Sequence, residues 1–303
     1  MHTYAIIGGA GFIGTNLSER LVAEEKRVIV IDDLSAGDHR DRLPKEVEFH
    51  QEDMRNTEAV TALLANVDVV VLLAALPRVQ FSIQYPRETH DVNVNGILSV
   101  LEAARAARVS RVVYAASSSA YGDQETLPLS EDLPAQPKSP YALQKYIGEQ
   151  YMKLWSSIYG LKTVSLRFFN VYGKHMDPEG AYALVVGKFL KARKEGKPLP
   201  ITGDGEQTRD FTHVRDTVDA VVRAAESEVV GHGEVFNVGA GDNVSINELA
   251  RLIGGEVEYV EARLEPKHTK ADNSKIHEVL GWQPTVVFAD GITELKVEWG
   301  IAE

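Results

Sequence analysis

The chain has 303 residues, no cysteine and a formal net charge of -12 at pH 7. Disulfides, thiolate nucleophiles and cysteine metal sites are therefore excluded, and the negative field argues against nucleic acid and anionic membranes as partners. The length suits one large α/β domain with a smaller companion, and we expect a cytoplasmic protein because no apolar run has membrane length and no signal pattern opens the chain.

The first half of the chain alternates short apolar runs with amphipathic segments, which predicts strands that alternate with helices. The expected strands are Tyr4–Ile7, Arg27–Ile31, Val47–His50, Val67–Leu73, Arg111–Ala116 and Thr163–Arg167. The expected helices are Thr15–Glu25, Asn56–Ala65, Asn93–Ala107 and Tyr141–Tyr159. This alternation is typical of the α/β class and predicts a Rossmann-type, doubly wound parallel sheet.

The alternation weakens after Phe168, where turn-rich segments occupy Gly173–Gly180 and Gly196–Gly205. We therefore predict a first domain over residues 1–168 and a smaller α/β domain over residues 169–303. Val235–Val238 is expected to be a strand that returns to the first sheet, so residues 213–240 are assigned to the first domain.

A glycine-rich segment, Gly8-Gly-Ala-Gly11-Phe-Ile-Gly14, follows the first strand and opens the first helix. Glycines in this context permit a tight turn and let the backbone approach a pyrophosphate, whose charge the helix N-terminus stabilises. Asp32 ends the second strand, where a carboxylate accepts hydrogen bonds from an adenosine ribose and disfavours a 2′-phosphate. The pattern predicts that the first domain binds NAD rather than NADP.

Further cofactor residues are expected beside these positions. Asp53 ends the third strand and is placed to meet the adenine amine, although aspartate is also common in turns. By their neighbouring positions we assign four more residues to the cofactor site: Phe12, Ile13, Asp33 and Met54.

Tyr141 and Lys145 lie four residues apart on a predicted helix, which places both side chains on one face. A free phenol has a pKa of about 10, and a neighbouring ammonium lowers it. The pair therefore predicts a general base, with an ordinary surface pair as the alternative. Ser117 follows a predicted strand at the sheet edge where ligands bind, whereas Ser118 beside it is interpreted as a capping or turn serine.

Four segments then carry a family resemblance: Ser117-Ser-Ser-Ala-Tyr-Gly122, Ser139-Pro-Tyr-Ala-Leu-Gln-Lys145, Arg167-Phe-Phe-Asn-Val-Tyr-Gly173 and Gly203-Asp-Gly-Glu-Gln-Thr-Arg-Asp-Phe211. With the glycine loop, they make the chain similar, over nearly its whole length, to the extended short-chain dehydrogenases/reductases. Within that family the chain resembles the nucleotide-sugar 4-epimerases, chiefly the UDP-glucose and UDP-N-acetylglucosamine types.

The resemblance implies roles for individual residues. Ser117, Tyr141 and Lys145 would be catalytic, and Lys145 would also hold the nicotinamide ribose. The positions implied at the cofactor are Leu73, Ala74, Ala75, Asn93, Tyr141 and Lys145. Those implied at the UDP-sugar are Ser117, Ser118, Tyr141, Asn170, Arg209, Arg263 and Thr269, with Asn170 at the diphosphate and the two arginines at phosphate oxygens.

The implied reaction is inversion at C4 of the sugar, in which Tyr141 takes the 4-hydroxyl proton and NAD carries the hydride. Dehydratases of the family have an Asp-Glu pair where Ser118 and Ser119 stand, and decarboxylases commonly have Glu at Ser119, so both activities are disfavoured. A small residue at Thr269, in place of a large aromatic one, is expected to admit an N-acetyl group.

Two other classes remain as alternatives. The first is another enzyme that modifies nucleotide sugars, either a reductase or a decarboxylase or epimerase of UDP-glucuronate. The second is a regulatory protein that binds NAD without catalysis. The nine histidines show no metal-ligand spacing, so no metal is expected. The resemblance also implies a homodimer formed through the helices Asn93–Arg108 and Tyr141–Tyr159. Their apolar faces are equally compatible with burial inside one chain.

Overall fold

The computed structural model describes residues 2–178, 185–261 and 267–301. Its centre is a parallel sheet with the strand order β11-β6-β5-β4-β1-β2-β3. The strands are β1 (Thr3–Ile7), β2 (Arg27–Asp32), β3 (Glu48–Gln51), β4 (Val69–Leu72), β5 (Arg111–Ser117), β6 (Lys162–Phe168) and β11 (His232–Val238). The predicted doubly wound α/β fold is confirmed, and Val235–Val238 forms the second half of β11.

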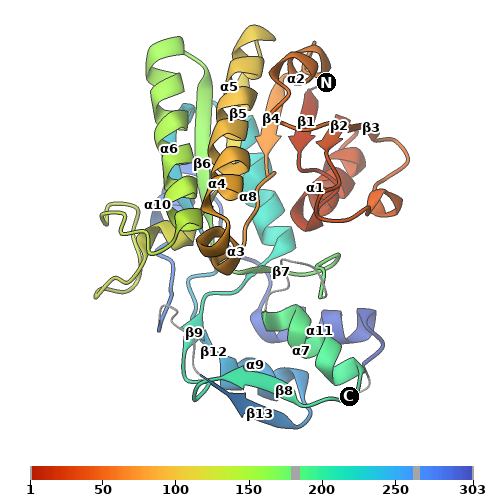
Figure 1. The fold of residues 1–303 in the computed structure, drawn as a ribbon, viewed down its shortest axis with the longest axis vertical. Coiled ribbons are helices and arrows are strands. Elements are labelled where there is room, and N and C mark those ends of the chain that lie inside the picture. The colour runs from red at the N-terminus through yellow and green to blue at the C-terminus, as the bar shows by residue number, and fades with distance from the viewer. Residues whose placement is uncertain (1, 179–184, 262–266, 302–303) are drawn as a thin grey trace.

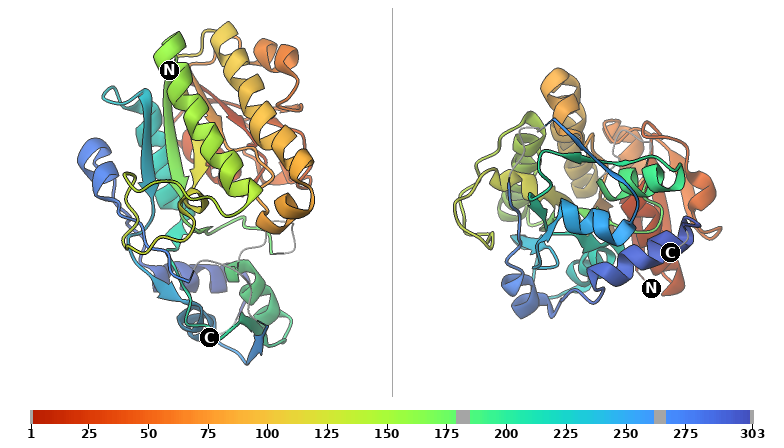
Figure 2. Two further views of the ribbon diagram at one scale, coloured as in Figure 1. Left: turned by 60° about the vertical axis from the view of Figure 1, so that its left-hand side comes forward. Right: turned by 90° about the horizontal axis from the view of Figure 1, so that it is seen from below.

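Helices cover both faces of this sheet (Figures 1 and 2). One face is covered by α1 (Phe12–Ala23) and α8 (Val214–Glu226), and the other by α2 (Thr57–Leu63), α5 (Gly96–Ala106) and α6 (Pro140–Tyr159). Because both faces are buried, the central strands are continuous runs of apolar residues rather than alternating ones.

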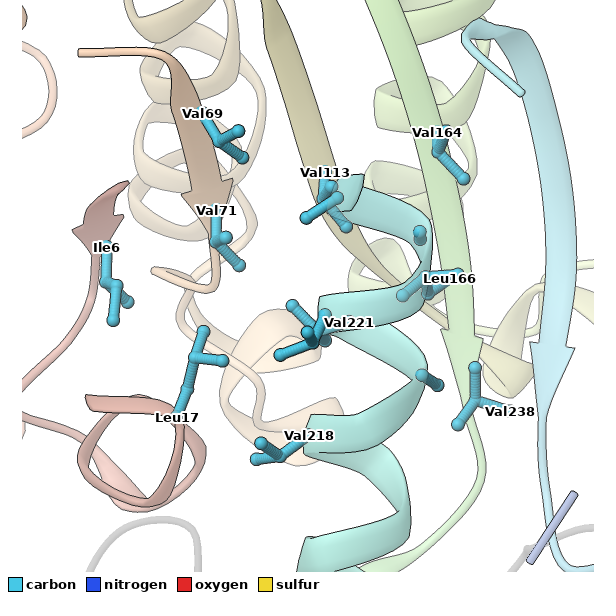
Figure 3. Close-up of a cluster of buried hydrophobic side chains, with 14 of the residues drawn as sticks. Ile6, Leu17, Val69, Val71, Val113, Val164, Leu166, Val218, Val221 and Val238 are labelled. Atoms are coloured by element: carbon cyan, nitrogen blue, oxygen red, sulfur yellow. The ribbon is translucent and has the colours of Figure 1, made fainter. Parts of the chain in front are cut away.

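Figure 3 shows the core on the side of α1 and α8. Val71 and Val113 from the strands pack toward Leu17 of α1 and Val221 of α8, and all four side chains are at most 1% exposed. Branched side chains suit this position because they fill the pleated surface of a sheet with little loss of rotamer freedom.

Two predicted helices begin elsewhere than expected. α1 begins at Phe12 rather than Thr15, because Gly11 is its N-cap and the glycine loop leads straight into the first turn. The helix expected from Asn93 is preceded by α4 (Pro86–His90) and a π-helical turn over Asp91–Asn95, which continue without a break into α5. Asn93 therefore lies on the π-turn, a feature that is frequent at functional sites.

A smaller lobe lies below the main sheet in Figure 1. It contains α7 (Val185–Lys194), α9 (Ile246–Ile253) and α11 (Phe288–Glu298), with β8 (Leu199–Thr202) paired in parallel with β13 (Val257–Val260). These elements enclose a separate apolar core. The segment expected to be only turn-rich at residues 196–205 thus contains β8, and the proposed domain boundary after residue 168 stays a prediction.

Several further elements are short. They are α3 (Val79–Gln84), α10 (Ser274–Leu280), β7 (Val171–Tyr172), β9 (Thr208–Arg209), β10 (Thr212–His213) and β12 (Val244–Ser245), with β10 paired to β7 and β12 to β9. In Figure 1 the strands of the main sheet point their carboxyl ends toward the smaller lobe. No helix in the described part of the chain is long and apolar enough to span a bilayer, and the cytoplasmic location stays a prediction.

Candidate active site

The strand order reverses between β1 and β4, and in open α/β sheets ligands bind at the carboxyl ends of the strands flanking such a point. Gly8 follows β1 with φ +83°, and a Cβ on it would lie 2.5 Å from the backbone nitrogen of Ala74 after β4. A Cβ on Gly14 would lie 2.5 Å from the Cα of Gly9. Only glycine fits these two positions, so the turn packs tightly and presents bare backbone at the start of α1, which suits a pyrophosphate.

Asp32 fixes the geometry of this turn. Its carboxylate accepts hydrogen bonds from the backbone nitrogens of Ala10 at 3.0 Å and Leu34 at 2.9 Å. Burial raises the pKa of Asp32, and those two hydrogen bonds oppose the rise. Each carboxylate oxygen keeps a further lone pair, so the group fits the ribose of a dinucleotide while it also ties the glycine loop to β2.

Asp53 is engaged by a neighbouring cation. Arg55 binds both its carboxylate oxygens, and the same guanidinium reaches Asp91 at 2.5 Å. Hydrogen bonds from Arg55 lower the pKa of Asp53 despite its partial burial. Arg55, held by Asp53, thus joins the loop after β3 to the π-turn before α5. Its predicted contact with an adenine amine stays a prediction.

The remaining residues assigned near the glycine loop have structural partners. Asp33 is exposed and accepts hydrogen bonds from both the backbone and the hydroxyl of Ser35. Met54 is 5% exposed, and its side chain occupies the space above Gly96 on α5. Two further residues stand partly buried in the first turn of α1: Phe12 and Ile13.

The segment after β4 lies against the end of β1, next to the predicted cofactor site. The backbone nitrogens of Leu73 and Ala74 both donate to the carbonyl of Ile7, each at 2.9 Å, which holds this segment against β1. Ala75 beside them is partly exposed. The backbone here is thereby placed next to the glycine turn, and its contact with the cofactor stays a prediction.

Asn93 joins this segment to the helix that carries Tyr141. It is 1% exposed, accepts from the nitrogen of Leu76 at 2.7 Å, and donates both to the Leu76 carbonyl and to Gln144 of α6. Gln144 in turn donates to Thr89. Sequence reasoning missed Gln144, although a polar side chain on the inner face between Tyr141 and Lys145 was an available signal.

The three residues predicted to be catalytic meet at the end of β5. Ser117 is its last residue, and its hydroxyl is hydrogen-bonded to the Tyr141 side chain on α6. Lys145 lies one turn further along α6, is 3% exposed, and donates from Nζ to the carbonyl of Ala115 at 2.8 Å. Two hydroxyls and the amine of a lysine therefore gather at the carboxyl edge of the sheet.

Of the two roles predicted for Ser118, the turn is confirmed, because Ser118 opens a 3-10 helix, whereas the capping role belongs to Ser117. Ser117, not Ser118, is the N-cap of the 3-10 helix Ser118–Tyr121, and its oxygen accepts from the backbone nitrogen of Ser119 at 3.2 Å. The Ser119 hydroxyl also donates to Ser117 at 2.9 Å. Because Ser117 ends an extended strand, its side chain is the one that reaches the first free backbone donors of the following turn.

The expected effect of Lys145 on Tyr141 is also wrong for the chain by itself. The pKa of Tyr141 is raised to about 12, because burial disfavours the phenolate more than the hydrogen bond with Ser117 favours it. Burial likewise lowers the pKa of Lys145 to about 7, against the opposing charge of Glu149. Both shifts favour neutral groups, and the sequence could not show this since the spacing of Tyr141 and Lys145 carries no information about burial.

The residues predicted to hold the substrate cluster beyond β6. Asn170 donates to the backbone carbonyl of Asp210 at 3.0 Å, and the hydroxyl of Thr269 accepts from the backbone nitrogen of Asp210 at 3.3 Å. Arg209 is the last residue of β9, directly before Asp210, and its guanidinium donates to the carbonyl of Thr208. Arg263, the second predicted phosphate residue, lies outside the described residues.

Asp210 is the residue of this cluster that sequence reasoning missed. Its carboxylate is buried and accepts from the backbone nitrogens of Ala240, Gly241 and Ala271. Burial raises its pKa to about 6 although these three hydrogen bonds favour the charged form. The Asp210 carboxylate thus ties its own segment, which also carries Arg209, to the loop after β11 and to the segment that carries Thr269, while its backbone carbonyl holds Asn170.

The register of the sheet relates this cluster to the catalytic residues. Ser117 pairs with Phe168 across β5 and β6, and Asn170 follows Phe168 by two residues. The cluster around Asp210 therefore borders the edge where Ser117 and Tyr141 meet. Among the residues that the structure describes, no group of three or more His, Asp or Glu side chains is arranged to hold a metal ion.

Comparison with known proteins agrees with this geometry. Residues 4–239 match the model of the NAD dependent epimerase/dehydratase family. A UDP-glucose 4-epimerase of Mycolicibacterium smegmatis is 40% identical over 95% of this chain and 96% of its own length.

Two solved structures have a TM-score of 0.92 and 32% identity. The UDP-glucose 4-epimerase of Thermotoga maritima, solved with UDP-glucose, is matched over 98% of both chains. The UDP-N-acetylglucosamine 4-epimerase of Methanobrevibacter ruminantium, solved with UDP-N-acetylmuramic acid, is matched over 99% of this chain and 98% of its own.

Proposed function

The chain belongs to the NAD-dependent epimerase/dehydratase family, and from this premise we propose that it inverts C4 of a UDP-hexose through a 4-keto sugar. The proposed substrates are UDP-glucose and UDP-galactose, together with their N-acetylated counterparts. The observation that carries the proposal is the meeting of Ser117, Tyr141 and Lys145 at the carboxyl edge of the sheet, the same edge that holds a turn where only glycine fits.

The residues of the chain fit the proposed cofactor and supply the proton chemistry. The glycine turn, Asp32 and Lys145 would hold NAD, which when bound supplies the group that accepts and returns a hydride. The phenolate form of Tyr141, which a protonated Lys145 beside it would favour, receives the proton of the sugar 4-hydroxyl and gives it back, while the Ser117 hydroxyl hydrogen-bonds the reacting oxygen. The proton and the hydride are both restored, so the reaction causes no net redox change.

Two features support epimerisation over the other activities. Ser118 and Ser119 offer no carboxylic acid to expel water, and the Ser119 hydroxyl donates to Ser117 instead. A regulatory protein that only binds NAD would have no use for a buried lysine beside paired hydroxyls at the ligand edge.

The decisive experiment is incubation of the purified protein with UDP-glucose, UDP-galactose, both UDP-N-acetylhexosamines, UDP-glucuronate and dTDP-glucose, followed by separation of the products. We expect C4 epimers of the UDP-hexoses without added cofactor and without accumulation of reduced NAD. Net oxidation or reduction would instead support a reductase, and binding of NAD with no product from any sugar would support the regulatory alternative.

The room around the sugar C2 substituent gives a first prediction. Thr269 is a small, partly exposed residue next to the Asp210 cluster, so Thr269→Tyr is expected to lower kcat/KM for UDP-N-acetylhexosamines by about tenfold or more while plain hexoses are still converted. Thr269→Ser keeps the hydroxyl that accepts from Asp210 and is the matched control. Equal turnover of N-acetyl sugars by the wild type and the tyrosine variant would remove this argument.

We also propose a homodimer, which the exposed face of α6 supports. Three side chains on this helix are 46%, 45% and 59% exposed: Leu143, Leu154 and Ile158. Leu154 follows Leu143 by about three turns and Ile158 follows Leu154 by about one turn, so all three lie on one side of the helix. A row of large apolar side chains along a helix is commonly an association surface.

Ile158→Asp should therefore convert a dimer to a monomer in sedimentation velocity, because an aspartate at the interface is buried without a partner. Val297→Asp on α11, at a position that is 76% exposed, is the control and should leave the mass unchanged. A wild-type protein that sediments as a monomer would contradict the proposed dimer.

A further inference from the structure

Lys145 occupies a place that disfavours its own charge. Its side chain is 3% exposed, its Nζ donates to one backbone carbonyl, and it stands 5.0 Å from the ring centre of Tyr114. Desolvation of this kind lowers the pKa of the ammonium to about 7. This pKa already includes the support of the nearby anion Glu149, so the amine is near its titration point at neutral pH and would lose its proton more readily without that anion.

The anion available to Lys145 is Glu149, one turn further along α6 and 1% exposed. Both carboxylate oxygens accept hydrogen bonds from Arg167 on β6, at 2.8 and 2.7 Å. Burial disfavours charge on Arg167, yet its bonds to Glu149 raise its pKa, so the guanidinium stays charged. Its charged centre also lies 4.5 Å from the ring of Tyr121.

This ion pair does more than the packing of the sheet requires. Replacing a buried pair by apolar residues of similar volume is often neutral or stabilising, so its place one turn from Lys145 needs another reason. The Glu149 carboxylate favours the proton on Lys145. Arg167 holds that carboxylate in one orientation, because two parallel hydrogen bonds fix the plane of the group.

We propose that Glu149 is a positioning residue for the proposed C4 epimerisation: its carboxylate favours the ammonium form of Lys145 beside Tyr141, and Arg167 holds that carboxylate in place. The inference rests on the proposed function, since Lys145 has this task only if Tyr141 exchanges a proton with a sugar. Glu149 itself does not touch the reacting atoms and acts through Lys145.

The other titratable groups around Lys145 are accounted for. Tyr141 shares its helix face, and Tyr114 on β5 is fully buried with a pKa raised well above its ordinary value by burial, so it stays neutral. Arg167 stands behind Glu149 on β6. Among the described residues, Glu149 is thus the acidic group that acts on Lys145.

The test is the pH dependence of kcat in Glu149→Gln, measured on the full chain with UDP-glucose. Loss of the carboxylate charge lets Lys145 release its proton at lower pH, so the alkaline limb of the profile should shift downward by about one pH unit. A residue with only a structural role would lower kcat at every pH and leave the limb in place.

A second readout does not depend on turnover. The 13Cε shift of Lys145, assigned by its absence in Lys145→Met, should report the same downward shift of the lysine titration. Because Glu149→Gln leaves Arg167 buried without its partner, the double variant Glu149→Gln/Arg167→Met, which removes both charges, is measured as well and should titrate like the single one. Arg167→Lys keeps both charges while it disturbs the bidentate contact, and its Lys145 titration should stay near that of the wild type.

Shifts confined to the two variants that lack the carboxylate would support the proposal. Equal shifts in all three variants, or none in any, would overturn it. If the wild type converts no UDP-sugar, the proposed function fails, and the Lys145 titration alone then decides whether Glu149 holds the charge.

Discussion

Tyr141→Phe is expected to lower kcat for UDP-sugar epimerisation by about 10²–10⁴-fold, the range that a positioned general acid or base contributes. The variant removes a single oxygen, the one that is hydrogen-bonded to Ser117. The backbone of the residue stays tied to the Ser82 hydroxyl at 3.0 Å, so the helix should not move. Initial rates at saturating substrate, with NAD content measured on the same preparation, provide the test.

The matched control is Tyr146→Phe, the same change on the same helix away from Ser117. It should retain the wild-type rate, and both variants should retain bound NAD, because the glycine turn and Asp32 are unaltered. A Tyr141→Phe protein whose kcat stays within about tenfold of the wild type would remove the proposed proton chemistry, whatever its NAD content.

Gly14→Ala is expected to destabilise the free protein by about 1–3 kcal/mol, the typical effect of overpacking. A Cβ at this position would lie 2.5 Å from the Cα of Gly9 and 2.7 Å from the carbonyl oxygens of both Gly8 and Gly9. All of these are backbone atoms, so relief requires the turn itself to shift. NAD affinity should fall with stability, and urea unfolding with and without NAD measures both effects.

Gly11→Ala separates the two effects. Gly11 has φ -75° and ψ 177°, which any residue adopts, and a Cβ there would come no nearer than 3.4 Å to the carbonyl of Gly8. Stability of the free protein should therefore change by less than about 0.5 kcal/mol, while NAD affinity falls because the methyl group stands where the pyrophosphate approaches. Equal stability of the two free variants would contradict this account of the turn.

The fold of the first half could be predicted because its pattern is local. Continuous apolar runs such as Val67–Leu73 identify strands buried on both faces, and the glycine loop marks the first helix. The start of α5 was misplaced because nothing in the spacing of Asn93 distinguishes a π-turn from the helix it leads into. The helix α8 had a clear signal in the spacing of Val214, Val218 and Val221, which was not used.

The residues that meet at the sheet edge could be predicted from the sequence, but the direction of their pKa shifts could not. Ser117, Tyr141 and Lys145 were found from motifs, and the structure brings them together. The direction of their pKa shifts depends on burial by distant segments, which spacing does not encode. Asp210 escaped for the same reason, since its partners Ala240 and Ala271 are 30 and 61 residues away in the chain.

The path of the chain means that the main sheet cannot form from the first half of the chain alone. After β6 the backbone leaves for β7, then comes back as α8, which covers one face of the sheet, and as β11, which lines the edge of β6. A fragment ending at residue 168 would lack both α8 and β11. Leu166 would be exposed, and β6 would become an edge strand with unpaired backbone amides, which promotes aggregation. The first half of the chain therefore cannot complete its sheet before most of the polypeptide has been synthesised.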